Sequence, residues 1–167
     1  PLFLVIIAAL KLSAPRHPVF YTQARVGRHN RRFNMVKFRS MVPGAEDQTG
    51  PVMVNEKEEK RYTKIGRCLR KWSLDELPQL YNVLMGEMSL VGPRPERPHF
   101  VEAFEKEIPH FRYRTQVKAG ITGWAQVNGR SVLTRRPEQK LKYDLYYVNN
   151  ASFLLDLKIL LKTVFVV

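Results

Sequence analysis

The sequence of 167 residues contains one cysteine, Cys68, and four scattered histidines. One cysteine excludes an internal disulfide framework and a zinc site made of several cysteines, and the histidines show no metal-ligand spacing. So little cysteine fits a reducing, cytosol-facing environment. Because Cys68 lies in an Arg-rich run with helical character, we expect it to be a small, half-buried helix residue.

Long hydrophobic runs are also missing. The apolar stretch at residues 1–12 holds one charge. As a helix rising about 1.5 Å per residue, it would cover only about half of a hydrocarbon core roughly 30 Å thick. A secretory signal fits poorly, because no basic segment precedes the stretch and no small-residue cleavage site follows it. Three interpretations stay open: a buried core helix or strand, a helix that enters a membrane and stops, or the second half of a longer segment. In a membrane, Lys11, Arg16 and His17 would lie on the cytoplasmic side.

Acidic residues are few compared with basic ones. Lys and Arg number 28 against 15 Asp and Glu, which gives a net charge of +13. Such a surplus predicts an acidic partner: nucleic acid, anionic lipid or a phosphorylated substrate. The chain contains no nucleic-acid-binding motif, so we expect no nucleic-acid partner. The length suits one domain over residues 1–167, and a start at Pro1 rather than Met predicts a longer polypeptide upstream.

The middle of the chain predicts an α+β, mostly helical fold with a small β-hairpin. Apolar and polar residues alternate over residues 18–38 around a turn at 27–30, which is the pattern of a hairpin. Helical spacing, or a proline near the start of the segment, predicts helices over 55–71, 98–110 and 137–149. Gly and Pro without periodicity predict a loop over 43–54, and three glycines predict a structured loop over 118–130.

The C-terminal stretch, residues 151–167, predicts an amphipathic helix. Ser152 is a suitable N-cap, and Asp156 falls in the first turns. Lys158 and Lys162 share one face, where they would reach lipid head groups while the aliphatic residues lie below them. Packing of this helix on a protein core is the alternative.

An acidic pair, Asp75 and Glu76, stands in the most basic neighbourhood of the chain. Carboxylates surrounded by cations predict a phosphate-handling site, in which the cations hold the anion and the carboxylates bind metal or attack phosphorus. The alternative is a capping box, with Ser73 as N-cap and Glu76 at N3. Pro78 would then fall inside the helix, where it is disfavoured, so we expect the helix to begin at Asp75 or beyond. The cations of this neighbourhood are Lys64, Arg67, Arg70, Lys71 and Arg94.

Five motifs in order resemble those of the bacterial sugar transferases called monotopic phosphoglycosyl transferases. They are residues 37–41 (Lys-Phe-Arg-Ser-Met), 73–80 (Ser-Leu-Asp-Glu-Leu-Pro-Gln-Leu), 89–95 (Ser-Leu-Val-Gly-Pro-Arg-Pro), 120–130 (Gly-Ile-Thr-Gly-Trp-Ala-Gln-Val-Asn-Gly-Arg) and 144–147 (Asp-Leu-Tyr-Tyr).

The resemblance implies transfer of a sugar 1-phosphate from a UDP-sugar to polyprenyl (undecaprenyl) phosphate. This step starts synthesis of surface polysaccharide or glycan at the cytoplasmic face of the bacterial inner membrane. It also implies a re-entrant helix broken at a Ser-Pro pair, whose proline Pro1 matches. Residues 1–12 would then be half of that membrane helix, residues 17–150 the cytosolic catalytic part, and residues 151–167 an interfacial helix.

The resemblance further implies roles for single residues. Asp75 becomes the nucleophile that carries a covalent phosphosugar, and Glu76 binds or orients Mg²⁺ beside it. Arg70 and Arg94 are the best phosphate clamps, because guanidinium engages phosphate bidentately. The remaining candidates are Lys37 and Arg39 for phosphate or lipid head groups, with a solvated hairpin edge as the alternative, and Arg130 for the nucleotide.

Other assignments stay open at this point. Trp124 and Tyr146 are interpreted as packing residues rather than as a platform for a base. A basic lipid- or nucleic-acid-binding module and a metal-dependent phosphohydrolase are the competing functions. The sequence identifies neither the sugar nor the oligomeric state, so a homo-oligomer remains an alternative.

Overall fold

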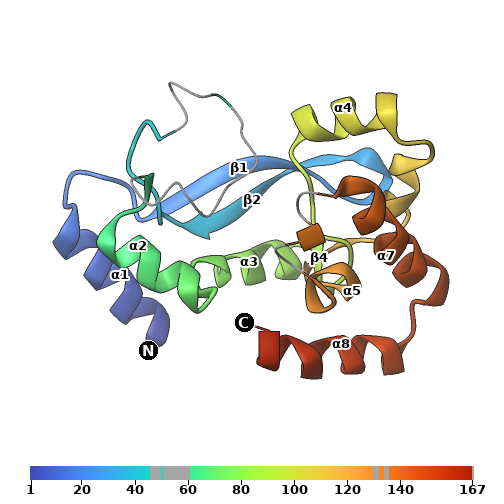
Figure 1. Cartoon of the computed structure of the whole chain (residues 1–167). Coiled ribbons are helices and arrows are strands. Elements are labelled where there is room, and N and C mark those ends of the chain that lie inside the picture. The colour runs from blue at the N-terminus through green and yellow to red at the C-terminus, as the bar shows by residue number, and fades with distance from the viewer. Residues whose placement is uncertain (46–49, 51–60, 130–131, 134–135, 167) are drawn as a thin grey trace. The chain divides into compact units, whose positions relative to one another are not determined.

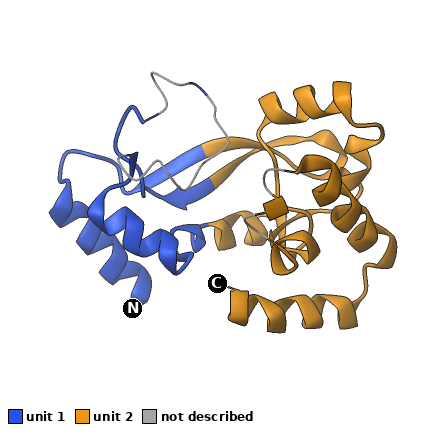
Figure 2. Ribbon diagram, in the orientation of Figure 1, with its two compact units in different colours: residues 1–22, 36–78 blue, residues 23–35, 79–167 orange. Residues whose placement is uncertain are grey.

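A computed structural model describes residues 1–45, 50, 61–129, 132–133 and 136–166 (Figure 1). The chain divides into two compact units. Unit 1 comprises residues 1–22 and 36–78, and unit 2 comprises residues 23–35 and 79–167 (Figure 2). Helices and two small two-stranded sheets make up the described residues, as expected for a helix-rich α+β chain. The expectation of a single domain over 1–167 stays a prediction.

The hairpin predicted over residues 18–38 is confirmed. Strands β1 (Phe20–Val26) and β2 (Arg32–Phe38) pair with each other. At one end the Arg39 N–H donates to the Val19 carbonyl at 2.8 Å, and at the other the Gly27 N–H donates to the Arg31 carbonyl at 2.8 Å. The turn η1 (Arg28–Asn30) contains left-handed backbone at His29, φ 54°, which histidine adopts more readily than most residues.

Unit 1 packs three short helical elements against the base of the hairpin: α1 (Leu2–Ser13), α2 (Lys64–Lys71) and η3 (Leu74–Glu76). Phe38 is 1% exposed, and its ring contacts those of Phe3 and Phe20, with centroids 5.0 and 5.5 Å away. The buried residues of this core are Ile6, Leu10, Val19, Phe38 and Leu69.

Helix α2 corrects the helix predicted over residues 55–71. Its N-cap is Thr63, whose hydroxyl accepts a bond from the Gly66 N–H at 2.9 Å. Tyr62 lies before the helix, in a bridge with Met41, because Thr63 begins the helical hydrogen bonding. The predicted residues 55–60 and most of the predicted loop 43–54 lie outside the described residues. Cys68 is exposed rather than half-buried, because the buried face of α2 runs through Gly66 and Leu69.

Helix α1 confirms that the apolar stretch at residues 1–12 is helical. Ile6 and Leu10 are buried in the core of unit 1. Leu4 and Val5 are 70% and 65% exposed, so the opposite side of the helix is apolar and uncovered within this unit. None of the helices in the described ranges has both the length and the apolar character needed to cross a membrane.

Unit 2 contains a parallel strand pair that sequence analysis missed. Strands β3 (Met88–Val91) and β4 (Ala119–Thr122) pair in parallel, with Met88 opposite Ala119 and Val91 opposite Thr122. The loop predicted over 118–130 is therefore wrong: it holds β4 and the short helix α5 (Trp124–Val127). Four-residue strands are too short to show a period, and two of the three glycines that suggested a loop, Gly120 and Gly123, allow close packing against the backbone of Gly92.

The helices of unit 2 pack either with this strand pair or with the tip of the hairpin. They are α3 (Gln79–Leu84), α4 (Pro98–Glu107), η4 (Phe111–Thr115), α7 (Pro137–Asn150) and α8 (Phe153–Val166) (Figure 1). Helices α4 and α7 match the predictions over 98–110 and 137–149, apart from a shorter C-terminal end in α4. One core joins the hairpin tip to α4, η4 and α7; a second joins β3, α5, α7 and α8. Tyr147 of α7 donates to Asp156 of α8 at 2.8 Å.

Helix α8 has an apolar outer face. The predicted N-cap is confirmed: the Leu155 N–H donates to the Ser152 hydroxyl at 3.3 Å. Ile159 is fully buried against unit 2. Lys158 and Lys162 lie with their ammonium groups 5.5 and 5.0 Å from the centroid of the Trp124 ring, so they border the packed side of the helix. The exposed residues are Phe153, Leu154, Leu157, Leu160, Leu161, Val164, Phe165 and Val166.

A substitution at Gly66 tests the packing of α2. A Cβ at this position would lie 1.8 Å from the carbonyl oxygen of Ser40, a backbone atom that cannot move aside. We expect Gly66→Ala to lower the free energy of unfolding, measured with urea, by about 1–3 kcal/mol, even though alanine favours helix. Cys68→Ala on the exposed side of the same helix is the control, with an expected change within about 0.5 kcal/mol. A more stable Gly66→Ala protein would contradict the packing.

Candidate active site

The acidic pair lies in a turn of 3₁₀ helix rather than in the first turn of an α-helix. Ser73 adopts left-handed backbone, φ 51° and ψ 20°, and makes no side-chain cap. The Glu76 N–H donates instead to the Ser73 carbonyl at 3.1 Å, so the capping-box alternative is wrong. Helix α3 begins at Gln79, directly after Pro78, because the proline cannot continue the hydrogen bonding inside a helix. This start lies within the predicted range, Asp75 or beyond, although the two carboxylates lie in the turn before the helix rather than at its N-terminus.

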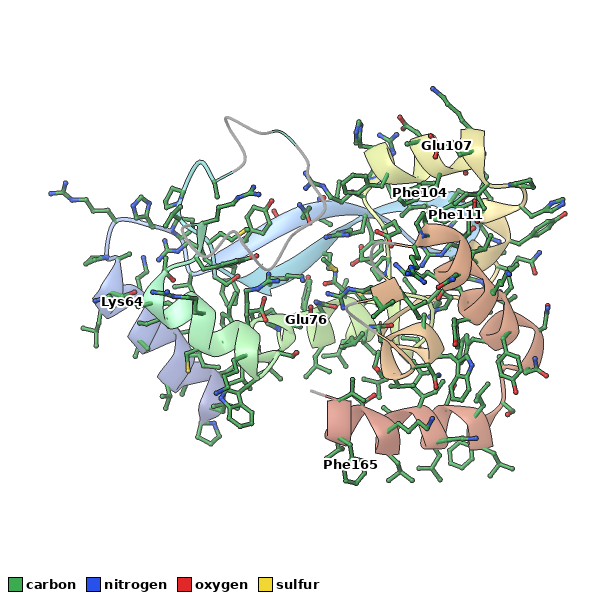
Figure 3. All side chains as sticks on the ribbon, viewed as in Figure 1. Lys64, Glu76, Phe104, Glu107, Phe111 and Phe165 are labelled. Atoms are coloured by element: carbon green, nitrogen blue, oxygen red, sulfur yellow. The ribbon has the colours of Figure 1, made fainter. Side chains whose placement is uncertain are left out.

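Both carboxylates are buried, and Lys37 compensates one of them. Asp75 is 3% exposed and Glu76 is 7% exposed. The Lys37 ammonium lies 3.2 Å from Glu76 Oε1, and its own side chain is only 14% exposed. Figure 3 shows Glu76 beside the hairpin from which Lys37 comes. A solvated hairpin edge is thus the wrong interpretation of Lys37, which belongs to the acidic site of unit 1.

Arg39 is a buried cation on the same side of the hairpin as Lys37. Successive side chains of an extended chain alternate between two faces. Because Phe38 faces the core of unit 1, Lys37 and Arg39 lie on the opposite face. Arg39 is 7% exposed, and burial lowers the pKa of its guanidinium. Its Nη1 nitrogen is buried with no hydrogen-bond acceptor among the described residues. A buried donor of this kind suits an anionic oxygen supplied by a ligand.

Arg70 lies in the last turn of α2 and stays exposed. Its guanidinium carbon is 4.6 Å from the centroid of the Tyr62 ring, a cation–π contact that limits the orientations of the side chain. Tyr62, which sequence analysis placed inside a helix, is instead the platform for this arginine. The predicted phosphate clamp at Arg70 stays a prediction.

The remaining candidates belong to other segments of the chain. Arg94 belongs to unit 2, in the segment that follows β3. Arg130 lies outside the described residues. Pro1 is exposed, and its carbonyl accepts a bond from the Val5 N–H at 3.1 Å at the start of α1. The match of Pro1 to a membrane break stays a prediction. Trp124 stacks on Tyr146 with ring centroids 5.6 Å apart, in keeping with packing roles for both.

A cluster of charged side chains in unit 2 was missed by sequence analysis. Glu96 pairs with Lys140, and Asp144, one turn further along α7, pairs with Arg114. Burial would raise the pKa of Glu96, but Lys140, Arg114 and Arg25 outweigh it and lower that pKa to about 2. The signal available in the sequence was the i, i+4 spacing of Lys140 and Asp144. That spacing predicts a pair with each other, whereas each bonds a different partner.

The donor set of the acidic site suits Mg²⁺ held jointly with a phosphate. Among the described residues, no group of three or more His, Cys, Asp and Glu side chains comes together as a metal site. Mg²⁺ commonly takes one or two carboxylates and completes its shell with waters and substrate phosphates. Asp75 and Glu76 meet that requirement.

The family assignment agrees with this site. The sequence model of the bacterial sugar transferase family matches residues 1–167. The chain therefore belongs to the bacterial sugar transferases.

Three relatives illustrate the similarity. A UDP-N-acetylgalactosamine-undecaprenyl-phosphate N-acetylgalactosaminephosphotransferase of Aeromonas hydrophila is 44% identical over 165 residues, 98% of this chain and 38% of the relative. The uncharacterized sugar transferase EpsL of Bacillus subtilis is 45% identical over 98% of this chain and 75% of its own length. A UDP-glucose:undecaprenyl-phosphate glucose-1-phosphate transferase of Xanthomonas campestris is 45% identical over 98% of this chain. The chain spans only 34% of that last relative.

The depressed pKa of Glu96 predicts a loss of stability in acid. A carboxyl group with a lowered pKa stabilises the fold fully above its ordinary pKa of 4.5, and that contribution disappears as the pH falls toward about 2. The shift corresponds to about 3 kcal/mol. We therefore expect the free energy of unfolding of the wild type, measured with urea, to fall by this amount as the pH is lowered from 4.5 to about 2.

The matched variant replaces both partners. Glu96→Gln with Lys140→Met leaves no uncompensated charge at that pair, so this part of the acid loss should be absent. An identical acid profile for wild type and double variant would contradict the assignment to Glu96.

Proposed function

We propose that this domain transfers a sugar 1-phosphate from a UDP-sugar to polyprenyl phosphate, with release of UMP, through a covalent intermediate on Asp75. The carrying observation is the buried acidic pair beside Lys37, in a chain of the bacterial sugar transferase family. The names of the Aeromonas and Xanthomonas relatives describe the same class of transfer to undecaprenyl phosphate. The product would start synthesis of a surface polysaccharide or glycan.

The proposed reaction has two displacements at one phosphorus atom. In the first, a carboxylate oxygen of Asp75 attacks the β-phosphorus of the UDP-sugar; the bond from that phosphorus to the bridging oxygen breaks, and UMP leaves with the electron pair. In the second, a phosphate oxygen of the polyprenyl phosphate attacks the same phosphorus and the Asp75 carboxylate is released. The glycosidic bond to the sugar stays intact throughout.

The cations of unit 1 would reduce the repulsion between the attacking carboxylate and the negatively charged donor. A carboxylate that attacks a pyrophosphate meets like-charge repulsion, which positive groups must reduce. Lys37 already offsets the charge of Glu76, and Arg39 carries a buried donor without an acceptor among the described residues. Further proposed contacts for phosphate and nucleotide oxygens are Arg70, which lies over the Tyr62 ring, and also Arg94 and Arg130.

Mg²⁺ is the proposed cofactor, held by Asp75 and Glu76 with waters and substrate phosphates. When bound, it supplies charge neutralisation for the two phosphates. Lys37 holds one oxygen of Glu76, so it orients that carboxylate for the metal.

The proposed location is the cytoplasmic face of a bacterial membrane, with anionic lipid as a partner. The supporting surface in unit 2 is the outer side of α8, where Leu154, Val164 and Phe165 are at least 75% exposed. Figure 3 shows Phe165 projecting from this helix near its C-terminal end. In unit 1 the uncovered side of α1 is also apolar. A net charge of +13 adds attraction for anionic head groups.

Replacement of the nucleophile tests the reaction. We expect Asp75→Asn to abolish UMP release and covalent labelling by a UDP-sugar in the full chain supplied with polyprenyl phosphate, because the amide is a poor nucleophile of the same shape. Folding should be retained, as judged by circular dichroism. The donor panel comprises UDP-glucose, UDP-galactose and their N-acetylated counterparts.

The same assay separates the alternatives. Free sugar phosphate formed without a lipid acceptor would indicate a phosphohydrolase instead. DNA binding at physiological salt, with no UMP from any donor, would indicate a binding module. Turnover by the Asp75→Asn protein would refute the nucleophile.

The apolar face of α8 predicts binding to lipid vesicles. We expect Leu161→Ser with Phe165→Ser to weaken co-sedimentation with anionic phosphatidylglycerol vesicles by about tenfold, because both exposed side chains would lose apolar contact. Tyr113→Ser, which removes a 50% exposed aromatic of η4, is the control and should leave vesicle binding unchanged. Equal effects of the two replacements would argue against α8 as the membrane surface.

A further inference from the structure

The segment after β3, residues 92–96, is held by its backbone carbonyls. The Pro93 carbonyl accepts from the Gly120 N–H at 3.0 Å, and the Arg94 carbonyl accepts from Arg114 Nη2 at 2.7 Å. The Pro95 carbonyl accepts from Arg25 Nη1 at 3.0 Å, and the Glu96 carbonyl accepts from the Val26 N–H at 2.9 Å. Four consecutive carbonyls are therefore bound by groups distant in sequence, although the segment is neither helix nor strand.

Proline and glycine restrict the same segment further. The two prolines have no N–H and a nearly constant φ, so the backbone on both sides of Arg94 has few alternatives. A Cβ on Gly92 would lie 2.3 Å from the Lys118 carbonyl oxygen, and one on Gly120 would lie 2.1 Å from the Gly92 nitrogen. Only glycine at both positions permits this approach of two backbones. The base of the segment is thus tightly packed against β4.

Arg114 is the side chain that binds Arg94. Its Nη2 lies 2.7 Å both from the Arg94 carbonyl and from Asp144 Oδ2, and its Nε donates to the same carboxylate oxygen at 2.9 Å. The side chains of Arg114 and Asp144 are only 4% and 2% exposed. The guanidinium also lies 5.2 Å from the centroid of the Phe111 ring. The contacts with Asp144 and Phe111 together hold the Arg114 guanidinium in one orientation.

Stability alone gives weak reason for a buried ion pair at this place. Removal of two charges from water costs several kcal/mol per ion, and apolar residues of similar volume often serve the fold as well. What the guanidinium provides in addition is a directed, charge-assisted bond to one carbonyl. That bond acts on the residue whose side chain is the proposed phosphate clamp.

We propose that Arg114, oriented by Asp144, is a positioning residue that holds the backbone of Arg94 so that the Arg94 side chain is set for the donor pyrophosphate. The inference rests on the proposed function of Arg94. Arg114 touches no substrate in this scheme and acts only through the Arg94 carbonyl. Misplacement of a binding group by about 1 Å is enough to cost a large factor in rate.

The test uses a variant that removes the pair without leaving a buried charge. Arg114→Met with Asp144→Leu keeps the volume apolar, so the thermal unfolding midpoint should stay close to that of the wild type. In the full chain, assayed by UMP release with polyprenyl phosphate and the best donor of the UDP-sugar panel, we expect KM for the UDP-sugar to rise about tenfold. KM for polyprenyl phosphate should change by less than about twofold.

A mutant cycle that includes Arg94→Ala distinguishes positioning of Arg94 from a general effect on the enzyme. Arg94→Ala alone should lower kcat/KM for the donor by about tenfold to a hundredfold, because a charge-assisted phosphate contact is lost. Adding the Arg114→Met and Asp144→Leu replacements should then cost nothing further, because the group they position is already absent. Losses that multiply would overturn the inference. So would wild-type kinetics of the Arg114→Met, Asp144→Leu protein when Arg94→Ala is impaired.

Arg112→Met is the matched control. Arg112 lies in the same turn, two residues before Arg114, and pairs with Glu105 at the surface, its side chain 63% exposed. Its replacement should leave both KM values unchanged, and an effect equal to that of the Arg114 variant would overturn the specific role of Arg114.

UDP binding, measured by calorimetry, distinguishes failure of the inference from failure of the proposed function. If the wild type releases no UMP, the proposed transfer fails. The inference then stands if the Arg114→Met, Asp144→Leu protein binds UDP about tenfold more weakly than the wild type, and it falls if the two bind equally or the wild type does not bind UDP at all.

Discussion

The ion pair between Lys37 and Glu76 is the contact on which the acidic site of unit 1 depends. Two adjacent carboxylates, each less than a tenth exposed, are costly to bury as charges unless a positive group lies near them. Lys37 supplies such a group from β2, at 3.2 Å. Its position follows from the register of the hairpin, because Phe38 in the core directs Lys37 and Arg39 to the opposite face. The core of unit 1 and the charge of its site are therefore set by the same strand.

In unit 2, too, carboxylates with little exposure are compensated by cations, but there the cations also bind the backbone. Two of its ion pairs have little exposure: Arg114 with Asp144, which are buried, and Glu96 with Lys140, which are half-buried. Three cations keep Glu96 ionised, and Arg114 binds the Arg94 carbonyl through Nη2 while it pairs with Asp144. Neutral side chains could fill this volume, whereas only a guanidinium joins a carboxylate to a carbonyl with such fixed geometry. Two of the cations of unit 2, Arg114 and Arg25, thus bind backbone carbonyls of the segment after β3.

The predictable part of the fold was the part with strong local signals. Alternation around Gly27, the proline at the start of α4 and α7, and the cap at Ser152 located these elements within a few residues. Pro78 indicated a helix that begins at Asp75 or beyond, and α3 begins at Gln79, but the 3₁₀ turn that holds the acidic pair was not predicted. The β3–β4 pair was missed, because four-residue strands joined through distant positions carry no periodicity.

By itself the sequence determined the family, the acidic pair and the identity of the candidate cations, because motifs and charge are local properties of the chain. Tertiary structure alone decided which cation meets which carboxylate. Lys37 reaches Glu76 across 39 positions, and Arg114 reaches Asp144 across 30 and the Arg94 carbonyl across 20. Pairing over such separations depends on strand register and helix packing, which bring distant residues to within 3 Å or so. A list of charged residues contains no information on that choice.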